Sequence, residues 1–372
     1  MERRDFLTSA IASAGLSLLP SAAAAANDPI TTGMIGTGNR GSYVLGEILK
    51  QPGVKVTALC DIKPDRLDKA ASSAVRDKPA TFKDYRDLLA RKDIDAVFID
   101  TPCYLHVEMA IAALKAGKHV YCEKPVGTTP ESIAELVAVA KASDRVFCVG
   151  QQMRSFDSVK RVADKIREGI VGDVVMVKAQ RHAGWDLDHD STSSDWFFDA
   201  KKSGDVIVEM AVHNLDVCNW MIGSHPERAA GFGGTQIWKN EPPGRTNMDG
   251  YTLSYDYPNN VKMSFTQVFF HPRGLPGDGQ YFYVYGTKGA VDVTSGKFYP
   301  LSKAKVEPTL ISQPDKERDA PHIAAFYESI RTGKKPPADI VIGATAALTA
   351  ILGREAIYRK TVMNWSDLGV QI

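Results

Sequence analysis

The feature that constrains this chain most is a regular alternation of short apolar runs with amphipathic segments between residues 30 and 150. Runs such as "ITTGMIG", "VKVTALCD", "AVFID", "HVYCEK" and "RVFCVG" are typical of buried strands, whereas "HVEMAIAALKAG" and "PESIAELVAVAKAS" have helical periodicity. A repeated strand–helix order requires parallel strands joined by right-handed crossovers. We therefore predict an α/β, doubly wound (Rossmann) parallel-sheet domain over residues 29–150.

A different texture follows residue 150, where longer strand-like runs are separated by turn signals. "VVMVKAQRH", "GYTLSYDY", "VKMSFTQVFF" and "YFYVYG" predict an α+β domain with a large, mostly antiparallel, open-faced sheet over residues 151–318. "DYPNNVKM" predicts a hairpin, because Asn259 and Asn260 tolerate positive φ. From residue 319 the pattern returns to helix, and we expect helices over 319–372 to pack back on the two domains.

The charge balance argues against a polyanionic partner. Among 372 residues, 45 basic and 44 acidic side chains give a formal net charge of +1, without long blocks of one sign. Such a chain lacks the basic face of a nucleic-acid binder or a membrane-surface protein, so we expect a small-molecule partner. The five cysteines include no C-x-x-C pair, and we interpret them as buried free thiols.

The first 26 residues have the organisation of an export signal peptide. Arg3 and Arg4 precede an apolar run over residues 10–19, and "SAAAAAN" offers an A-x-A cleavage site near Ala26. "RRDFL" resembles the twin-arginine signal, whose route carries folded proteins, so we expect a periplasmic or otherwise exported protein. The alternative is an uncleaved apolar N-terminal helix. The run is too short for an ordinary membrane anchor, and no later stretch of the sequence reaches about 18 unbroken apolar residues.

A glycine-rich turn predicts a dinucleotide site. Gly36, Gly38 and Gly41 form G-x-G-x-x-G directly after an apolar run and directly before a helical pattern. Asp61 ends the next predicted strand, where a carboxylate accepts from ribose hydroxyls and repels a 2′-phosphate. We therefore predict NAD, with NADP left open by nearby basic residues such as Arg40; the alternative is a glycine turn chosen for packing.

Two further segments offer groups for proton transfer. "YCEKP" places Lys124 just beyond a predicted strand, at the carboxyl edge where ligands of open α/β sheets bind. "GDVIVEMAVHNLDVCNW" predicts one helix with Glu209, His213 and Asp216 on one face, where a carboxylate orients the histidine as a general base. The alternative for Lys124 is a solvated surface lysine, and the alternative for the Glu209–His213 pair is an ion pair on the helix surface.

The segment "HAGWDLDHDSTSSDW" combines indole rings with carboxylates, which suits a sugar. We predict substrate contacts from His182, Trp185 and Trp196. Its D-x-D-x-D start is similar to a calcium loop, but the sixth position is Ser191 and the twelfth is Phe197, so no metal is predicted. An ordered surface loop is the alternative.

Taken together, the glycine turn, "TPCYLHVEMAIAALKAGKHVYCEKP", "VGQQMR", the Glu209 to Asp216 segment, "YGTKGAV" and "HIAAFYESIRTGKKPPADIVIGATAALTAI" resemble the Gfo/Idh/MocA oxidoreductases. The resemblance extends from residue 30 onward. It implies a nucleotide-binding domain followed by an open-faced sheet domain, with NAD or NADP serving hydride transfer at a sugar or cyclitol carbon.

The resemblance also implies roles for individual residues. Lys124 matches the lysine of the family's EKP motif, and His213 matches the histidine of its D-x-x-x-H pattern, in which Glu209 replaces the aspartate. Arg154 resembles a residue at the substrate edge. The predicted cofactor-binding residues are Gly36, Gly38, Asn39, Arg40, Gly41, Asp61, Thr101, Pro102, His106, Glu123 and Lys124.

An exported enzyme cannot exchange NADH with the cytoplasm, so we expect a tightly bound cofactor and a reaction that restores it. Two chemistries satisfy this condition: oxidation of a sugar or polyol coupled to reduction of a second carbonyl compound, and redox-neutral hydrolysis of a glycoside. A third hypothesis is a catalytically silent periplasmic sugar-binding or scaffold protein. An open sheet face also favours a homo-oligomer.

Overall fold

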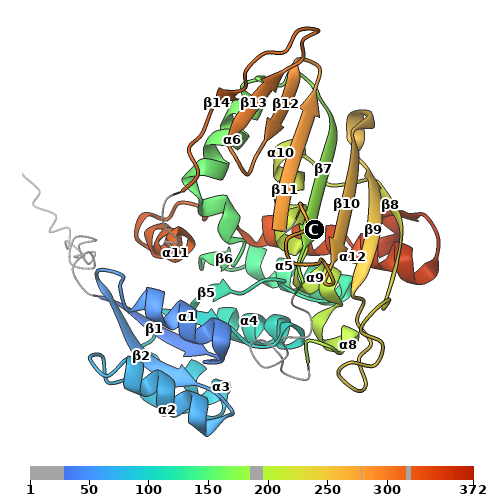
Figure 1. The fold of residues 1–372 in the computed structure, drawn as a ribbon. Coiled ribbons are helices and arrows are strands. Elements are labelled where there is room, and N and C mark those ends of the chain that lie inside the picture. The colour runs from blue at the N-terminus through green and yellow to red at the C-terminus, as the bar shows by residue number, and fades with distance from the viewer. Residues whose placement is uncertain (1–28, 185–195, 278, 316–319) are drawn as a thin grey trace, which may run out of the picture.

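The computed structural model describes residues 29–184, 196–277, 279–315 and 320–372. The predicted signal peptide and Trp185 lie outside the described residues. The chain forms two sheets, with the N-terminal sheet below and the second sheet above it in Figure 1.

Six parallel strands form the first sheet in the order β3-β2-β1-β4-β5-β6, which confirms the predicted Rossmann fold. The strands are β1 (Ile30–Ile35), β2 (Val54–Cys60), β3 (Ala80–Phe82), β4 (Ala96–Ile99), β5 (His119–Cys122) and β6 (Phe147–Val149). The helices between them are α1 (Asn39–Ile48), α2 (Pro64–Ser73), α3 (Tyr85–Leu89), α4 (His106–Lys115) and α5 (Pro130–Lys141). The chain reverses its direction of winding between β1 and β4, and ligands of such sheets bind there.

The sequence did not reveal β3 and α3. β3 is a three-residue strand at the sheet edge, and two of its residues are exposed, so it lacks an apolar run. α3 is five residues long, too short to show helical periodicity.

Nine strands form the second sheet in the order β14-β13-β12-β11-β7-β10-β9-β8-β15. They are β7 (Val174–His182), β8 (Arg228–Gly234), β9 (Gly250–Asp256), β10 (Lys262–Val268), β11 (Gly279–Gly286), β12 (Gly289–Asp292), β13 (Lys297–Pro300), β14 (Thr309–Leu310) and β15 (Met363–Asn364). Only the β7–β10 pair is parallel among the pairings described, so the prediction of a mostly antiparallel sheet is confirmed. Asn259 and Asn260 have φ of 59° and 61° in the turn between β9 and β10, as predicted.

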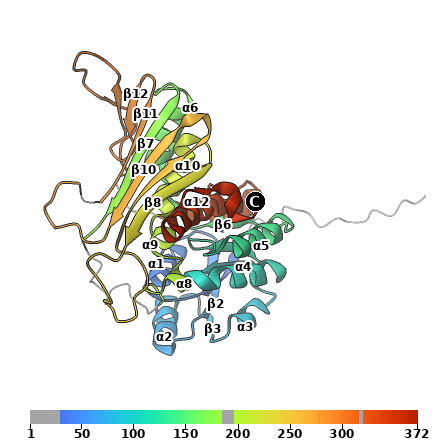
Figure 2. The same cartoon turned by 90° about the vertical axis from the view of Figure 1, so that its right-hand side faces the viewer.

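Helices cover one face of the second sheet: α6 (Asp157–Arg167), α10 (Val212–Ile222) and α12 (Ile340–Arg359). The opposite face carries none of the described helices (Figure 2). α12 is long and apolar enough to cross a membrane, with a mean hydropathy of 1.6, but 72% of that window is buried inside the molecule. It is a core helix that packs on α10, on β8 and on α5 of the first domain.

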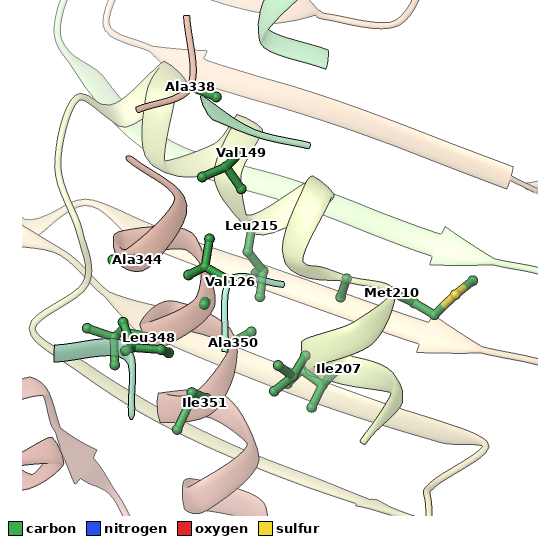
Figure 3. Packing of buried hydrophobic residues seen from close by; sticks show 14 of the residues in the cluster. Val126, Val149, Ile207, Met210, Leu215, Ala338, Ala344, Leu348, Ala350 and Ile351 are labelled. Carbon is green, nitrogen blue, oxygen red and sulfur yellow. The ribbon is translucent and has the colours of Figure 1, made fainter. Parts of the chain in front are cut away.

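One continuous core joins the two domains (Figure 3). Val126 and Val149 come from the first domain. They pack with Ile207 and Leu215, which lie in the second domain between β7 and β8. Leu348 of α12 completes the cluster. This packing fixes the loop after β5 against the helices of the second domain, and so it determines which side chains meet at the junction.

The C-terminal segment contributes to both domains. α11 (Pro321–Thr332) packs on the first sheet, where Phe326 lies edge-on to Phe98 and Tyr327 bonds to Thr32 at 3.0 Å. β15 extends the second sheet beside β8. The five cysteines are buried and free, as predicted.

Candidate functional site

The glycine turn between β1 and α1 has the geometry that a dinucleotide phosphate requires. Gly36 has a φ of 92°, and a Cβ there would lie 2.5 Å from the carbonyl oxygen of Asp100. A Cβ on Gly41 would lie 2.1 Å from the carbonyl oxygen of Gly36, so the close helix–strand approach requires glycine. α1 begins after Gly38 without a side-chain cap and without an acidic residue in its first turn. Its N–H groups and the positive end of its dipole are therefore suited to an anion.

Asp61 lies beside this turn at the end of β2. Its Oδ2 accepts hydrogen bonds from the backbone N of Thr37 at 2.8 Å and from the Thr37 hydroxyl at 3.1 Å, and its Oδ1 accepts from the backbone N of Lys63 at 2.9 Å. Arg66 lies over Gly38, where a Cβ would approach its guanidinium to 3.1 Å. The carboxylate is thus fixed next to the turn, and the choice between NAD and NADP stays a prediction.

His106 ties together the loops that follow β4 and β5. Its Nδ1 lies 2.6 Å from the carbonyl oxygen of Pro125 and its Nε2 lies 2.8 Å from that of Thr101. Burial lowers the pKa of His106, so the neutral ring donates to one carbonyl at a time. The histidine positions residues 101–102 next to residues 123–124 at the carboxyl edge of the sheet.

Two carboxyl groups below this edge have opposite electrostatic environments. Glu123 is 4% exposed and accepts from Arg40 Nε at 2.7 Å. Burial acts to raise the pKa of Glu123, but Arg40 and Lys124 outweigh it and the pKa is lowered. Burial and the charge of Glu123 raise the pKa of Asp100 well above its ordinary range and so favour its neutral form. Neither oxygen of Asp100 has a hydrogen-bond partner among the described residues.

Lys124 connects the first domain to the second. Its Nζ donates to Glu209 Oε1 and to the Glu209 carbonyl oxygen, both at 2.7 Å. The two side chains are 15% and 12% exposed. An ammonium group has three N–H donors, and these two bonds leave the third for a ligand. Glu209 Oε2 is buried and has no partner within the described part of the chain.

The prediction of one helix over residues 204–220 is wrong, because the structure has two: α9 (Val206–Glu209) and α10 (Val212–Ile222). Asp205 starts α9 with a φ of 72°, and its side chain accepts from the backbone N of Val206. The break lets the Glu209 carbonyl accept from Lys124, whereas a continuous helix would direct it to the N–H of residue 213.

His213 follows the break and is partly exposed. Its Nδ1 lies 3.1 Å from Oε1 of Gln151, so the amide oxygen accepts from Nδ1–H and leaves the lone pair on Nε2. Burial, followed by the charges of Lys124 and Arg181, lowers the pKa of His213 well below its ordinary value. The imidazole is therefore neutral and able to accept a proton. Gln151, rather than the predicted carboxylate, orients it.

The break separates Asp216 from Glu209, whereas Asp216 and His213 both lie on α10, where Asp216 pairs with Arg154. Asp216 is 1% exposed and accepts from Arg154 Nε at 2.8 Å. The Arg154 guanidinium lies 4.9 Å from the centre of the Trp220 ring. The structure thus directs Arg154 to α10 and does not bring it together with Lys124.

The last two residues of β7 point to opposite faces of the second sheet. Arg181 follows buried Val177 and Ala179 at intervals of two and shares their face, which α10 covers. His182 lies on the other face, where its Nε2 is 3.0 Å from the Thr266 hydroxyl. Sequence reasoning selected His182 and missed Arg181, although the alternation of "VKAQRH" could have identified it.

The remaining predicted substrate residues come from the aromatic loop. Trp196 is half-buried, packs against the core and meets Phe197 edge-on with ring centres 6.2 Å apart. Trp185 lies in the part of the loop that the structure does not describe.

The residues present fit a bound dinucleotide. The uncapped start of α1 and the Arg66 guanidinium over Gly38 suit its phosphates, as described above. Buried polar atoms without a partner among the described residues gather at the neighbouring strand ends: both oxygens of Asp100, Thr101 Oγ1 and Gln151 Nε2. Buried polar groups are normally bonded, so such a concentration indicates a ligand.

Two family models match the chain. One, described as an oxidoreductase family with an NAD-binding Rossmann fold, matches residues 30–151. The other, a GFO/IDH/MocA C-terminal domain, matches residues 159–292. The chain belongs to the Gfo/Idh/MocA family of NAD(P)-dependent oxidoreductases. The family matches extend over both sides of the Lys124–Glu209 contact.

Proteins of several named activities are similar to the chain. A glycosyl hydrolase family 109 protein of Saccharopolyspora erythraea is 35% identical over 158 residues, which cover 40% of this chain and 34% of that protein. A 2,7-anhydro-N-acetylneuraminate hydratase of Mediterraneibacter gnavus is 28% identical over 263 residues, covering 70% of this chain and 66% of that protein. Each match leaves at least a third of the relative's length unmatched.

The solved structure of a levoglucosan dehydrogenase in complex with NADH and levoglucosan has the same fold. It superposes with a TM-score of 0.78 at 20% identity and covers 91% of this chain and 99% of that one.

Proposed function

We propose that the protein is an NAD-dependent oxidoreductase that oxidises a hydroxyl-bearing carbon of a sugar or polyol, with NADP as the alternative cofactor. The observation that carries this proposal is the bonding of Lys124 to Glu209 at the carboxyl edge of the first sheet, within electrostatic range of neutral His213. The levoglucosan bound to the dehydrogenase of the same fold supports the substrate class. When bound, NAD supplies the hydride acceptor.

Each residue of this cluster then has a distinct role. Lys124 donates its free N–H to the substrate hydroxyl oxygen and stabilises the negative charge that develops there. His213 Nε2 accepts the hydroxyl proton while the C–H hydrogen leaves with its electron pair, and the carbon becomes a carbonyl. Glu209 positions Lys124, and Gln151 positions the imidazole through Nδ1.

A second candidate is redox-neutral hydrolysis of a glycoside, which the similarity to a glycosyl hydrolase family 109 protein favours. Transient oxidation of one sugar carbon acidifies the neighbouring C–H, the glycosidic group leaves by elimination, water adds, and the carbonyl is reduced again. The same proton-transfer residues serve both reactions. They differ in outcome, because only this reaction releases an aryl group from a chromogenic glycoside without a second carbonyl substrate.

We also propose that the protein is exported with its cofactor already bound. "RRDFL" near the N-terminus supports the twin-arginine route, and neither reaction exchanges NADH with the surroundings.

One experiment tests the cofactor and the reaction in sequence. The protein is purified from the periplasm of expressing cells and denatured without added nucleotide, and the released compound is identified by mass and absorbance. We expect close to one NAD per chain, and then oxidation of a sugar when a second carbonyl compound is present. An empty protein that binds NAD only weakly would contradict the captive cofactor. Release of an aryl group without the second compound would replace oxidoreduction with hydrolysis.

A further inference from the structure

Arg181 occupies the end of β7 on the face that packs towards the site. In the sheet it lies opposite Gln267 of β10 and Gln280 of β11. The side chain of Asn214 on α10 donates to Gln280 Oε1 at 2.9 Å, which places the start of α10 against these strand ends. Arg181 is close enough to influence His213 and Glu209 electrostatically.

The guanidinium has neither a hydrogen bond nor an ion pair with any described residue, although it is partly buried. Burial lowers the pKa of Arg181, and the charge of Glu209 acts against that lowering. An arginine stays charged under these conditions, so the protein contains a partly desolvated cation without a bonded counter-ion in its described part.

The other arginines around the site have partners. Arg40 is bonded to Glu123 and Arg154 to Asp216, so these pairs are balanced. The cluster at the junction is not balanced: Lys124 and Arg181 contribute two cations against the single carboxylate of Glu209.

A second donor lies next to Arg181. Gln267 is 1% exposed, its Oε1 accepts from the Tyr251 hydroxyl, and its Nε2 is buried without a partner among the described residues. Because Gln267 and Arg181 are register partners on adjacent strands, their side chains share one face of the sheet. A guanidinium and an amide N–H side by side form a donor set for an anionic oxygen group.

We infer that the substrate is an acidic sugar, and that Arg181 binds its carboxylate while Gln267 Nε2 donates to the same group. This inference rests on the proposed function and specifies its substrate class. A carboxylate accepts two parallel hydrogen bonds from the planar guanidinium and neutralises the excess positive charge. A hydroxyl group offers a single oxygen to the guanidinium and leaves the charge in place.

Paired substrates test this inference. Glucose is compared with glucuronate, and galactose with galacturonate, because each pair differs only in the carboxylate. Reduction of the bound nicotinamide reports the single hydride transfer, reduction of an added second carbonyl compound reports steady-state turnover, and the ligand-induced rise in melting temperature reports binding without turnover. The variants are Arg181→Gln, Arg181→Lys, and the control Lys178→Gln, which removes an exposed cation from the opposite face of the same strand.

We expect wild-type kcat/KM to be at least about tenfold higher for one hexuronate than for its neutral counterpart. Arg181→Gln should lower kcat/KM for the hexuronate by about 100-fold, which corresponds to the loss of a charge-assisted hydrogen bond. The same variant should keep kcat/KM for the neutral sugar within about threefold of wild type. For the hexuronate, kcat/KM of Arg181→Lys should lie between those of wild type and Arg181→Gln, and kcat/KM of Lys178→Gln should equal that of wild type. Unchanged melting temperatures without ligand show that the variants are folded.

Other outcomes overturn the inference in distinguishable ways. If neutral sugars are oxidised and hexuronates are not, the proposed function stands and the acidic substrate is rejected. Equal losses for both members of a pair in Arg181→Gln would assign Arg181 to the reacting centre or to the fold. If no sugar reduces the nicotinamide, the proposed function fails. Binding then still tests the role of Arg181, because a hexuronate must raise the melting temperature of the wild-type protein and leave that of Arg181→Gln unchanged.

Discussion

The two sides of the site differ in how their charged groups are satisfied. On the nucleotide side, Arg40 is bonded to Glu123, and Asp61 accepts hydrogen bonds at both carboxylate oxygens. On the sheet side, Arg181 and one oxygen of Glu209 have no partner in the described part of the chain. Satisfied groups hold a shape, whereas unsatisfied buried groups mark where a ligand completes the structure. On the proposed function, the paired charges of the nucleotide side hold its cradle in shape, although the side chains of Asp100 and Thr101 there still lack partners among the described residues. The unpaired charges of the sheet side are left to select the substrate.

Lys124 joins these two sides, so its replacement is the most severe test of the comparison. Lys124→Met should lower kcat by about 1000-fold, because it removes the donor to the reacting oxygen. The cradle does not depend on this amine, so bound NAD should remain near stoichiometric. The measurement combines turnover with cofactor content, and Lys115→Met, an exposed lysine of α4, is the control. Full turnover in Lys124→Met would contradict the assigned role.

The cradle itself is tested by Gly41→Ala. The new Cβ would lie 2.1 Å from the Gly36 carbonyl, so α1 must shift from β1. We expect NAD affinity to fall by about 10- to 100-fold, the cost of overpacking a close contact, with kcat largely restored at saturating NAD. Gly46→Ala in the same helix is the matched control, because nothing lies within 4 Å of its Cβ. That variant should bind NAD normally and gain up to about 1 kcal/mol of stability. Equal affinities in the two variants would show that the turn does not hold the cofactor.

The pH dependence of kcat/KM tests His213, with an effect smaller than those of Lys124→Met and Gly41→Ala. Because burial, Lys124 and Arg181 lower the pKa of His213, the base stays neutral well into the acidic range, and the acid limb of kcat/KM should lie below the ordinary range of histidine. Gln151→Glu places a negative charge at Nδ1, which stabilises the imidazolium and raises that pKa. The acid limb should therefore move to higher pH, while activity above it changes little.

The control for this measurement is Gln51→Glu, the same replacement beyond the end of α1, which should leave the profile in place. An acid limb that moves equally in both variants, or in neither, would remove His213 as the base.

Sequence alone identified the side of the site that is local in the chain. The glycine turn, Asp61 and the EKP lysine lie within short segments whose spacing carries the signal, and the structure places them at the ends of adjacent strands. It did not identify Gln151, because its relation to His213 depends on how distant segments pack; the alternation along β7 places Arg181 on the inner face of the sheet but does not show that this face meets His213. The predicted helix over 204–220 failed for the same reason: its periodicity is regular, and the tertiary contact from Lys124 to the Glu209 carbonyl accompanies the break.

The smallest effect on catalysis is expected from Arg154, which the family resemblance places at the substrate edge. In the structure its guanidinium is bonded to buried Asp216 and lies over Trp220, so it is satisfied like the groups of the cradle. Arg154→Met should destabilise the fold by about 3–5 kcal/mol, since it leaves a buried carboxylate without its partner. The folded fraction should keep kcat/KM within about threefold, and Arg154→Met combined with Asp216→Leu should recover much of the stability. A large loss of kcat/KM for an acidic sugar, with an unchanged melting temperature, would instead move Arg154 to the substrate side and make it a second anion-binding group beside Arg181.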